Sequence, residues 1–263
     1  MVPGACYLPA AMNVIPQAVK DGFVRLTKPI VGRLVRARVR PNTITTVGAG
    51  VVIGSAVAFA LSDIRLGGLL LLLSGLLDIL DGQVARVGGV SSTFGAFYDS
   101  TLDRVGESAL FAGIALHFLR NGLPPAQAPL GVMLAITALA SSLLVSYTRA
   151  RAEGLGLECK VGIAARAERF LLLGAPTLLL GNAWDGRLLF WIVAVLALVT
   201  VITVIQRIIY VARTAGAVPA RRTGMVDRAA GADNIRRGVV RMNVRFHGGK
   251  RVGTVAAEGA SRK

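Results

Sequence analysis

The chain is poor in the residues on which most metal sites and nucleophilic triads of soluble enzymes depend. Of its 263 residues, only two are histidine (His117 and His247) and two are cysteine (Cys6 and Cys159). Two cysteines supply neither a disulfide framework nor a set of thiolate ligands with zinc spacing. The sequence therefore argues against a histidine-based metal site, a histidine-containing triad and a fold held together by disulfides.

Charged residues are also scarce. They make up 17% of the chain, whereas 54% of the residues are hydrophobic. A soluble domain of this length would need more polar surface. This composition favours an integral membrane protein.

Long apolar runs are what the sequence has instead. Each run is long enough, or nearly so, to cross a bilayer core of ~30 Å as a helix. We therefore predict an all-α fold with six transmembrane helices, the first opening at Pro41 with Asn42 or Thr43 as its cap. The six predicted spans are residues 43–62, 66–84, 93–119, 128–149, 168–182 and 188–211.

Acidic residues are few, 14 against 30 lysines and arginines, which gives a net charge of +16. The basic residues concentrate at 20–40, at 149–169 and in the C-terminal tail. The loops predicted on the opposite side of the membrane hold only Arg65, Arg120 and Arg187. By the positive-inside rule, both termini of this multi-pass cell-membrane protein are cytoplasmic, as six crossings require. Basic residues that alternate between loops in this way are explained by membrane topology. The tail also lacks the interleaved aromatic residues that stack on bases, so the sequence argues against a nucleic-acid partner.

The composition divides the chain into three parts. Residues 1–40 form an N-terminal segment, in which Asn13 to Arg40 mix apolar and basic positions as an amphipathic helix on an anionic cytoplasmic leaflet does. A solvated basic linker is the alternative. Residues 41–214 form the membrane domain, and residues 215–263 form a basic tail that we expect to be disordered or loosely associated with the membrane. The sequence leaves open whether Met1 or Met12 is the true start.

One stretch inside the apolar region carries four carboxylates: "DILDGQVARVGGVSSTFGAFYDSTLD", residues 78–103. Asp78 and Asp81 are three residues apart, and Asp99 and Asp103 are four apart, so each pair lies on one helix face. The stretch Gly82–Ser92, with Gly88 and Gly89, can make the tight reversal that joins two antiparallel helices. The two pairs are therefore predicted to meet at similar depth in a helical hairpin.

Four carboxylates at close range cannot all stay ionised without cations. Two divalent ions would balance their charge, and an all-oxygen set favours Mg²⁺ or Mn²⁺ over zinc. Two such ions are the usual apparatus for displacement at phosphorus. Gly82 lets a phosphate approach the backbone, and Arg86 can pair with a diphosphate.

Two other readings of the aspartates compete with this one. Pairing with Arg86 and Arg104 for packing alone would leave negative charge unmatched, and charges within spans are usually functional. A cation transporter would also bind ions through carboxylates. It gives Gly82 and Arg86 no role, and these aspartates gather at one end of the helices rather than at the midplane.

The pattern Asp78-x-x-Asp81-Gly82-x-x-Ala85-Arg86, eight residues, Gly95-x-x-x-Asp99-x-x-x-Asp103 resembles the complete signature of the CDP-alcohol phosphotransferases. The resemblance implies a six-helix membrane enzyme, commonly homodimeric. It would move a phosphatidyl-type group from a CDP-linked lipid to an alcohol and release CMP, a step of phospholipid biosynthesis.

The resemblance also implies roles for individual residues. All four aspartates would hold two Mg²⁺ ions, with Mn²⁺ as a substitute, and Asp103 would also be the general base. The expected contacts with the CDP-lipid are Asn42, Thr43, Ile44, Thr45, Gly82, Arg86 and Ser92.

The acceptor alcohol is suggested by arginines at the ends of the last three spans. Their convergence suits an acceptor that carries a phosphate, although positive-inside topology alone also explains them. "SYTRARAEGLGL", the "ARAER" run at 165–169 and Gln206-Arg207 are similar to the bacterial members that join CDP-diacylglycerol to inositol phosphate, 1D-myo-inositol 3-phosphate. Arg151 and Arg207 would match their acceptor-phosphate arginines. Ala165 and Ala167 depart from that pattern.

Two alternatives within the family stay open. A phosphatidylglycerol-phosphate synthase would use glycerol 3-phosphate, which is also a phosphorylated acceptor. An archaeal-type ether lipid would replace diacylglycerol in the donor.

Overall fold

The computed structural model describes residues 17–157, 159, 161–162, 166–181 and 187–217. Its elements are α1 (Gln17–Arg36), α2 (Pro41–Ala60), α3 (Ile64–Val87), α4 (Thr93–His117), the π-helical turn η1 (Phe118–Gly122), α5 (Ala128–Gly154), α6 (Arg166–Leu180) and α7 (Arg187–Ala217). No strand occurs in the described part of the chain, so the predicted all-α fold is confirmed. Met12 and nearly all of the predicted tail, 215–263, lie outside the described residues.

Each of the six predicted spans corresponds to one helix, α2 to α7. Of the described helices, three are long and apolar enough to cross a membrane: α2, α5 and α7. Helices α3 and α4 carry the four aspartates, and α6 has 15 residues, which is about 22 Å at 1.5 Å per residue. Six crossings therefore stay a prediction.

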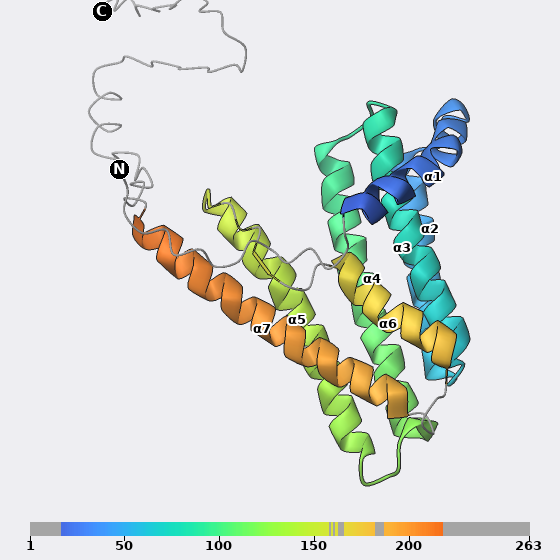
Figure 1. Cartoon of the computed structure of the whole chain (residues 1–263), viewed down its shortest axis with the longest axis vertical. Coiled ribbons are helices and arrows are strands. Elements are labelled where there is room, and N and C mark those ends of the chain that lie inside the picture. Colours follow the sequence, from blue (N-terminus) through green and yellow to red (C-terminus); the bar gives the residue numbers. More distant parts are fainter. Residues whose placement is uncertain (1–16, 158, 160, 163–165, 182–186, 218–263) are drawn as a thin grey trace, which may run out of the picture. The chain divides into compact units, whose positions relative to one another are not determined.

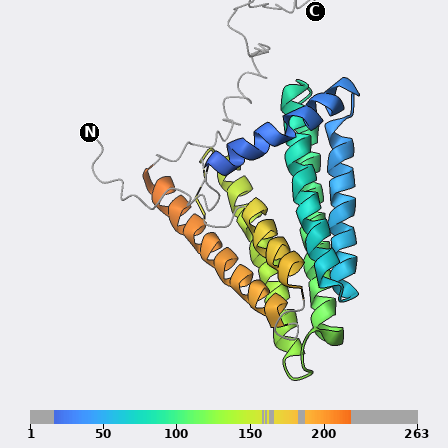
Figure 2. The same cartoon turned by 45° about the vertical axis from the view of Figure 1, so that its right-hand side comes forward.

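A single apolar core ties these helices together. Helix α2 packs against α3 and α4, α6 lies against α3, and α5 lies against α4. Figures 1 and 2 show α2, α3 and α4 side by side, with α5 and α7 on the other side of α6. The core draws one or more buried side chains from each of these six helices, for example Phe59, Leu71, Ile114, Ala135, Leu173 and Leu196.

Glycines bring neighbouring helices into backbone contact at two places. A Cβ on Gly113 of α4 would collide with the Ala56 carbonyl of α2. A Cβ on Gly68 of α3 would lie 2.8 Å from the Gly174 carbonyl oxygen of α6. These close approaches fix α4 against α2 and α6 against α3.

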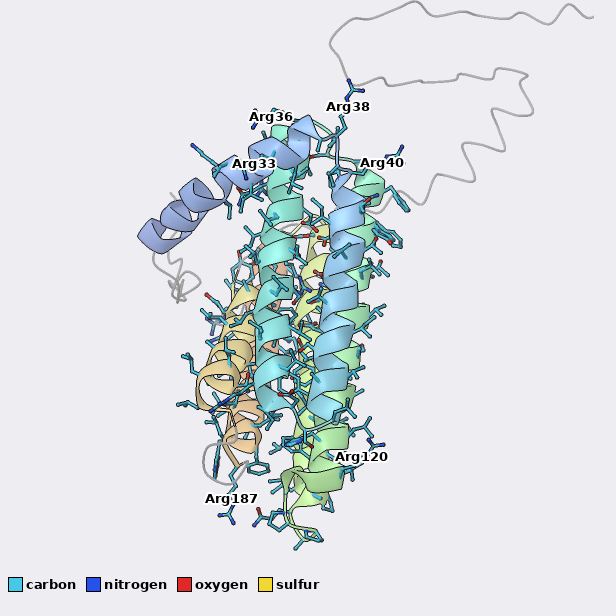
Figure 3. The ribbon with its side chains drawn as sticks, turned by 90° about the vertical axis from the view of Figure 1, so that its right-hand side faces the viewer. Arg33, Arg36, Arg38, Arg40, Arg120 and Arg187 are labelled. Carbon is cyan, nitrogen blue, oxygen red and sulfur yellow. The ribbon has the colours of Figure 1, made fainter. Side chains whose placement is uncertain are left out.

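Helix α1 crosses the end of α3 (Figures 1 and 3). Val31 of α1 is buried, and it packs with Leu34 and Val35 against Leu80 and Val84 of α3. The apolar residues of α1 led us to predict a helix at the membrane surface. Some of them pack against α3 instead, while Ile30 is exposed. A position of α1 at a membrane surface stays a prediction.

The basic residues separate along the helices. Figure 3 shows Arg33, Arg36, Arg38 and Arg40 at the end where α1 lies, and Arg120 and Arg187 at the opposite end. This is the separation on which the predicted topology rests.

Two local expectations need correction. Arg40, in extended conformation, is the N-cap of α2, Pro41 occupies the first turn, and no side chain caps the helix, so a cap by Asn42 or Thr43 was wrong. Helix α3 also continues through Gly82 to Val87 before Gly88 ends it and Gly89 turns with φ +63°. The reversal is therefore shorter than the sequence suggested.

We predict that Gly113→Ala destabilises the protein by about 1–3 kcal/mol, because the new methyl group overpacks the contact with Ala56. Gly50→Ala, in α2 with open space around the added Cβ, is the matched control and should stabilise by roughly 0.5–1 kcal/mol. Thermal unfolding in detergent measures both. Equal melting temperatures for the two variants would contradict the proposed backbone contact.

Candidate metal and nucleotide site

Three of the four aspartates meet in one place. Carboxylate oxygens of Asp78, Asp99 and Asp103 all lie within 4.8 Å of one another. The first comes from the second half of α3 and the other two from the first half of α4. The short turn between these antiparallel helices brings them to the same depth, as the hairpin predicted.

Asp81 is held separately from this group. It is buried, and its Oδ2 accepts a 2.7 Å hydrogen bond from Thr45 Oγ1 of α2. The bond ties α3 to the first turns of α2. Asp81 nevertheless lines the same small cavity as the other three aspartates.

Two arginines contact the carboxylates. Arg166, the first residue of α6, places Nη1 3.0 Å from Asp78 Oδ1 and 2.8 Å from Asp103 Oδ1. Its guanidinium also lies over the ring of Phe170, 4.6 Å from the centroid. Arg104 Nη1 lies 3.3 Å from Asp103 Oδ2. The charges of Asp78 and Asp103 are therefore partly balanced by the protein itself.

Arg166 is the site residue that the sequence did not single out. It belongs to the "ARAER" run, which drew notice only as part of a resemblance and as topological charge. Nothing local to that run says which of its arginines reaches the aspartates. Ala165, in the same run, lies outside the described residues.

The aspartate cluster fits a divalent cation. Asp99 Oδ1 is buried and has no hydrogen-bond partner in the part of the chain that the structure describes, which is costly for a carboxylate oxygen unless a ligand meets it. The cavity beside it has a volume of about 20 Å³ and is lined by all four aspartates and Arg166. That space suits an ion or a water rather than a substrate, and oxygen ligands suit a hard cation.

A larger cavity, of about 210 Å³, opens beside the aspartates. Five of the seven predicted CDP-lipid contacts line it: Asn42, Thr45, Gly82, Arg86 and Ser92. Thr43 and Ile44 do not line it, since Thr43 is exposed and Ile44 packs in the cluster under α1. Thr45, Asp81 and Asp99 line both cavities, so a molecule in the larger one lies next to the carboxylates.

Ser92 is also the N-cap residue of α4. Its hydroxyl accepts a hydrogen bond from Gly95 N at 2.9 Å and so caps α4. Capping positions the first turn of the helix that carries Asp99 and Asp103.

The two predicted acceptor arginines lie in different settings. Arg151 is exposed in the last turn of α5. Arg207 is buried in α7, where its Nε donates to Val161 O at 2.9 Å and its Nη1 donates to Val145 O. Arg207 thus binds the segment after α5 to α5 itself. A role for either arginine in holding an acceptor stays a prediction.

Comparison with known proteins identifies the family. The CDP-alcohol phosphatidyltransferase family model matches residues 38–205. The chain belongs to that family. The resemblance found in the sequence is therefore confirmed, and the protein is a transferase. Together with the three apolar helices, family membership makes it a membrane protein.

Particular members of the CDP-alcohol phosphatidyltransferase family are similar over most of their length. The phosphatidylinositol phosphate synthase of Cutibacterium acnes is 38% identical over 202 residues, which are 74% of this chain and 96% of the relative. The archaetidylinositol phosphate synthase of Methanothermobacter thermautotrophicus is 36% identical, over 73% of this chain and 96% of its own.

Solved structures of the Mycobacterium tuberculosis phosphatidylinositol phosphate synthase share the fold. The structure with CDP-DAG bound matches with a TM-score of 0.63 at 28% identity, covering 71% of this chain and 94% of that one. The structure in complex with manganese and citrate matches with a TM-score of 0.62 at 29% identity, covering 70% and 88%.

We predict that Asp99→Asn weakens Mn²⁺ binding at least ~10-fold, because it replaces a charged ligand oxygen by a neutral one at a cost of about 1.4 kcal/mol or more. Electron paramagnetic resonance of Mn²⁺ with detergent-purified protein measures the change without any turnover. Asp63→Asn, which keeps the cap of α3 by accepting from Leu66 N, is the control and should bind as the wild type does. Unchanged binding by the Asp99 variant would exclude this carboxylate as a ligand.

Proposed function

We propose that the protein transfers the phosphatidyl group of CDP-diacylglycerol to inositol phosphate, giving phosphatidylinositol phosphate and CMP. The observation that carries the proposal is the adjacency of the two cavities, which share Thr45, Asp81 and Asp99. A nucleotide held in the larger cavity would present its diphosphate to the aspartates. The names of the similar relatives support inositol phosphate as the acceptor.

The reaction is a displacement at phosphorus. The oxygen of an acceptor hydroxyl attacks the phosphorus that bears diacylglycerol, the bond from that phosphorus to the oxygen of CMP breaks, and CMP leaves. Asp103 accepts the hydroxyl proton as general base. Two Mg²⁺ ions, or Mn²⁺ in their place, held by the four aspartates would offset the negative charge of the diphosphate.

The protein's own groups bind and orient the substrates. Asn42, Thr45, Gly82, Arg86 and Ser92 surround the nucleotide end of the donor, and Arg86 offers its planar guanidinium to phosphate oxygens. Thr45 holds Asp81 through the 2.7 Å hydrogen bond. These contacts keep the donor phosphorus beside Asp103.

Arginines hold the acceptor's phosphate. Arg166 borders the aspartate cavity. We therefore add it to Arg151 and Arg207 as a third candidate contact of the acceptor's phosphate. A phosphorylated acceptor suits such a site because guanidinium groups bind phosphate in two-point fashion.

We further propose that α2 to α7 all cross the cell membrane, with both termini cytoplasmic and α1 at the cytoplasmic surface. The separation of Arg33, Arg36, Arg38 and Arg40 from Arg120 and Arg187 supports this orientation. Residues 1–40, 41–214 and 215–263 are then the interfacial segment, the catalytic membrane domain and a cytoplasmic tail. A homodimer is proposed from the family resemblance.

Other members of the family define the competing functions. Glycerol 3-phosphate as acceptor would make the protein a phosphatidylglycerol-phosphate synthase. The similarity to an archaetidylinositol phosphate synthase favours testing an ether-lipid donor as well. A cation transporter loses its support, because the chain belongs to a transferase family.

The acceptor is tested by offering purified protein CDP-diacylglycerol with inositol phosphate, inositol and glycerol 3-phosphate, each with Mg²⁺. We expect CMP release and a new lipid of the mass of phosphatidylinositol phosphate with the first acceptor, and little product with free inositol, which lacks the phosphate. Faster turnover with glycerol 3-phosphate would assign the runner-up function. No CMP release with any acceptor would contradict transferase activity on this donor.

Gly82→Ala tests the nucleotide cavity. A Cβ at Gly82 would meet only the Arg86 guanidinium, at 3.6 Å, so the protein tolerates the methyl group and the melting temperature should not fall. A bound nucleotide would not tolerate it, and we expect CDP affinity to fall roughly tenfold or more, about 1.4 kcal/mol.

The matched control is Gly54→Ala in α2, where the Cβ makes an ordinary contact 3.7 Å from Leu70. Isothermal titration with CDP compares the three proteins. Wild-type affinity in the Gly82 variant would place the nucleotide elsewhere.

A further inference from the structure

Two ion pairs join α4 to α6, one helical turn apart. The outer pair is Arg166 with Asp103, at the aspartate site. In the inner pair, Arg169 Nη2 lies 2.5 Å from Glu107 Oε1. Asp103 and Glu107 are four residues apart and Arg166 and Arg169 are three apart, so each helix presents both partners on one face.

The inner pair is built into the protein interior. The side chains of Glu107 and Arg169 are 2% and 5% exposed. Ser142 of α5 donates a further hydrogen bond to the same Glu107 oxygen at 2.9 Å. Three helices therefore converge on one carboxylate.

Stability alone does not explain this pair. Replacing a buried ion pair by apolar side chains of similar size is often neutral or stabilising, because both charges lose their hydration on burial. A guanidinium and a carboxylate do supply a directional link that apolar packing lacks. The inner pair thus specifies how α6 is placed against α4.

Helix α6 has a particular need for such a link. It has 15 residues, begins at Arg166, and contains Pro176, which cannot donate a helix hydrogen bond. Its backbone contact with α3 is at Gly68 and Gly174, about two turns from Arg166. Close to Arg166, the buried ion pair of Arg169 with Glu107 links α6 to α4.

We propose that Glu107, Arg169 and Ser142 are positioning residues that hold Arg166 between Asp78 and Asp103, and so set how strongly the aspartates bind a divalent cation. The proposal rests on the metal site of the proposed function but not on the identity of its acceptor. A guanidinium and a metal ion compete for the same carboxylate oxygens. Releasing Arg166 therefore raises metal affinity.

The experiment measures Mn²⁺ dissociation constants by electron paramagnetic resonance on the full-length protein in detergent, without substrates. Arg166→Ala should bind Mn²⁺ about tenfold more tightly, because the competing charge is gone. Glu107→Met with Arg169→Met removes both buried charges together and leaves neither unpaired. This double variant should unfold at or above the wild-type temperature and shift Mn²⁺ affinity in the same direction.

Combining the changes decides whether the effect passes through Arg166. In a protein that already carries Arg166→Ala, the Met pair should cause no further change in Mn²⁺ affinity. Wild-type affinity in a folded Met-pair variant would overturn the proposal. An equal shift with and without Arg166 would also overturn it, since the pair would then act on the aspartates by another route.

Ser142→Ala keeps the proposal testable if the Met pair does not fold. It removes one donor to Glu107 and should tighten Mn²⁺ binding by a smaller factor, again only when Arg166 is present. Ser141→Ala is the matched control, because the neighbouring Ser141 hydroxyl is buried on α5 but meets Thr200 instead. Equal effects of the two serine changes would contradict the positioning role.

Failure of this inference can be told apart from failure of the proposed function. A product other than phosphatidylinositol phosphate would leave the Mn²⁺ results untouched. Absence of Mn²⁺ binding in the wild type would overturn both the metal site and this inference.

Discussion

The gathering of four carboxylates inside an apolar helical protein is the constraint on which the rest of the structure depends. Ionised groups packed this closely need partners, because their charges repel one another. The protein supplies Thr45 to Asp81, Arg166 to Asp78 and Asp103, and Arg104 to Asp103. Among the described residues, Asp99 Oδ1 has no hydrogen-bond partner. That oxygen is where the arrangement calls for an added cation.

The helical framework serves this arrangement. A short turn after Gly88 brings the aspartates of α3 and α4 to one depth, and Gly113 draws α4 onto α2. The first turns of α2 then supply Asn42 and Thr45 to the larger cavity. The larger cavity and the aspartate cavity are adjacent because both are lined by residues near the same ends of α2, α3 and α4.

The sequence predicted much of this because the informative signals are local. Apolar runs predicted the helices α2 to α7, and the spacing of the aspartates placed them on facing sides of one hairpin. Helix periodicity also accounts for Asn42 and Thr45, three residues apart, facing the larger cavity while Thr43 and Ile44 face away. The family followed from the same stretch of sequence, since its signature lies almost wholly within the hairpin. The start of α2 and the end of α3 were predicted less accurately, because Pro41 and Gly82 are each compatible with more than one local backbone structure.

Contacts between distant helices could not be predicted in this way. Which arginine reaches the aspartates depends on how α6 is placed against α4, and we propose that this placement depends on Glu107, Arg169 and Ser142 from three helices.

The most direct test of the account is anomalous diffraction from crystals grown with Mn²⁺ and CDP. We expect manganese bound by Asp78, Asp99 and Asp103. We expect the nucleotide in the cavity lined by Asn42, Gly82 and Arg86. Manganese bound elsewhere, with these carboxylates free of metal, would contradict the account.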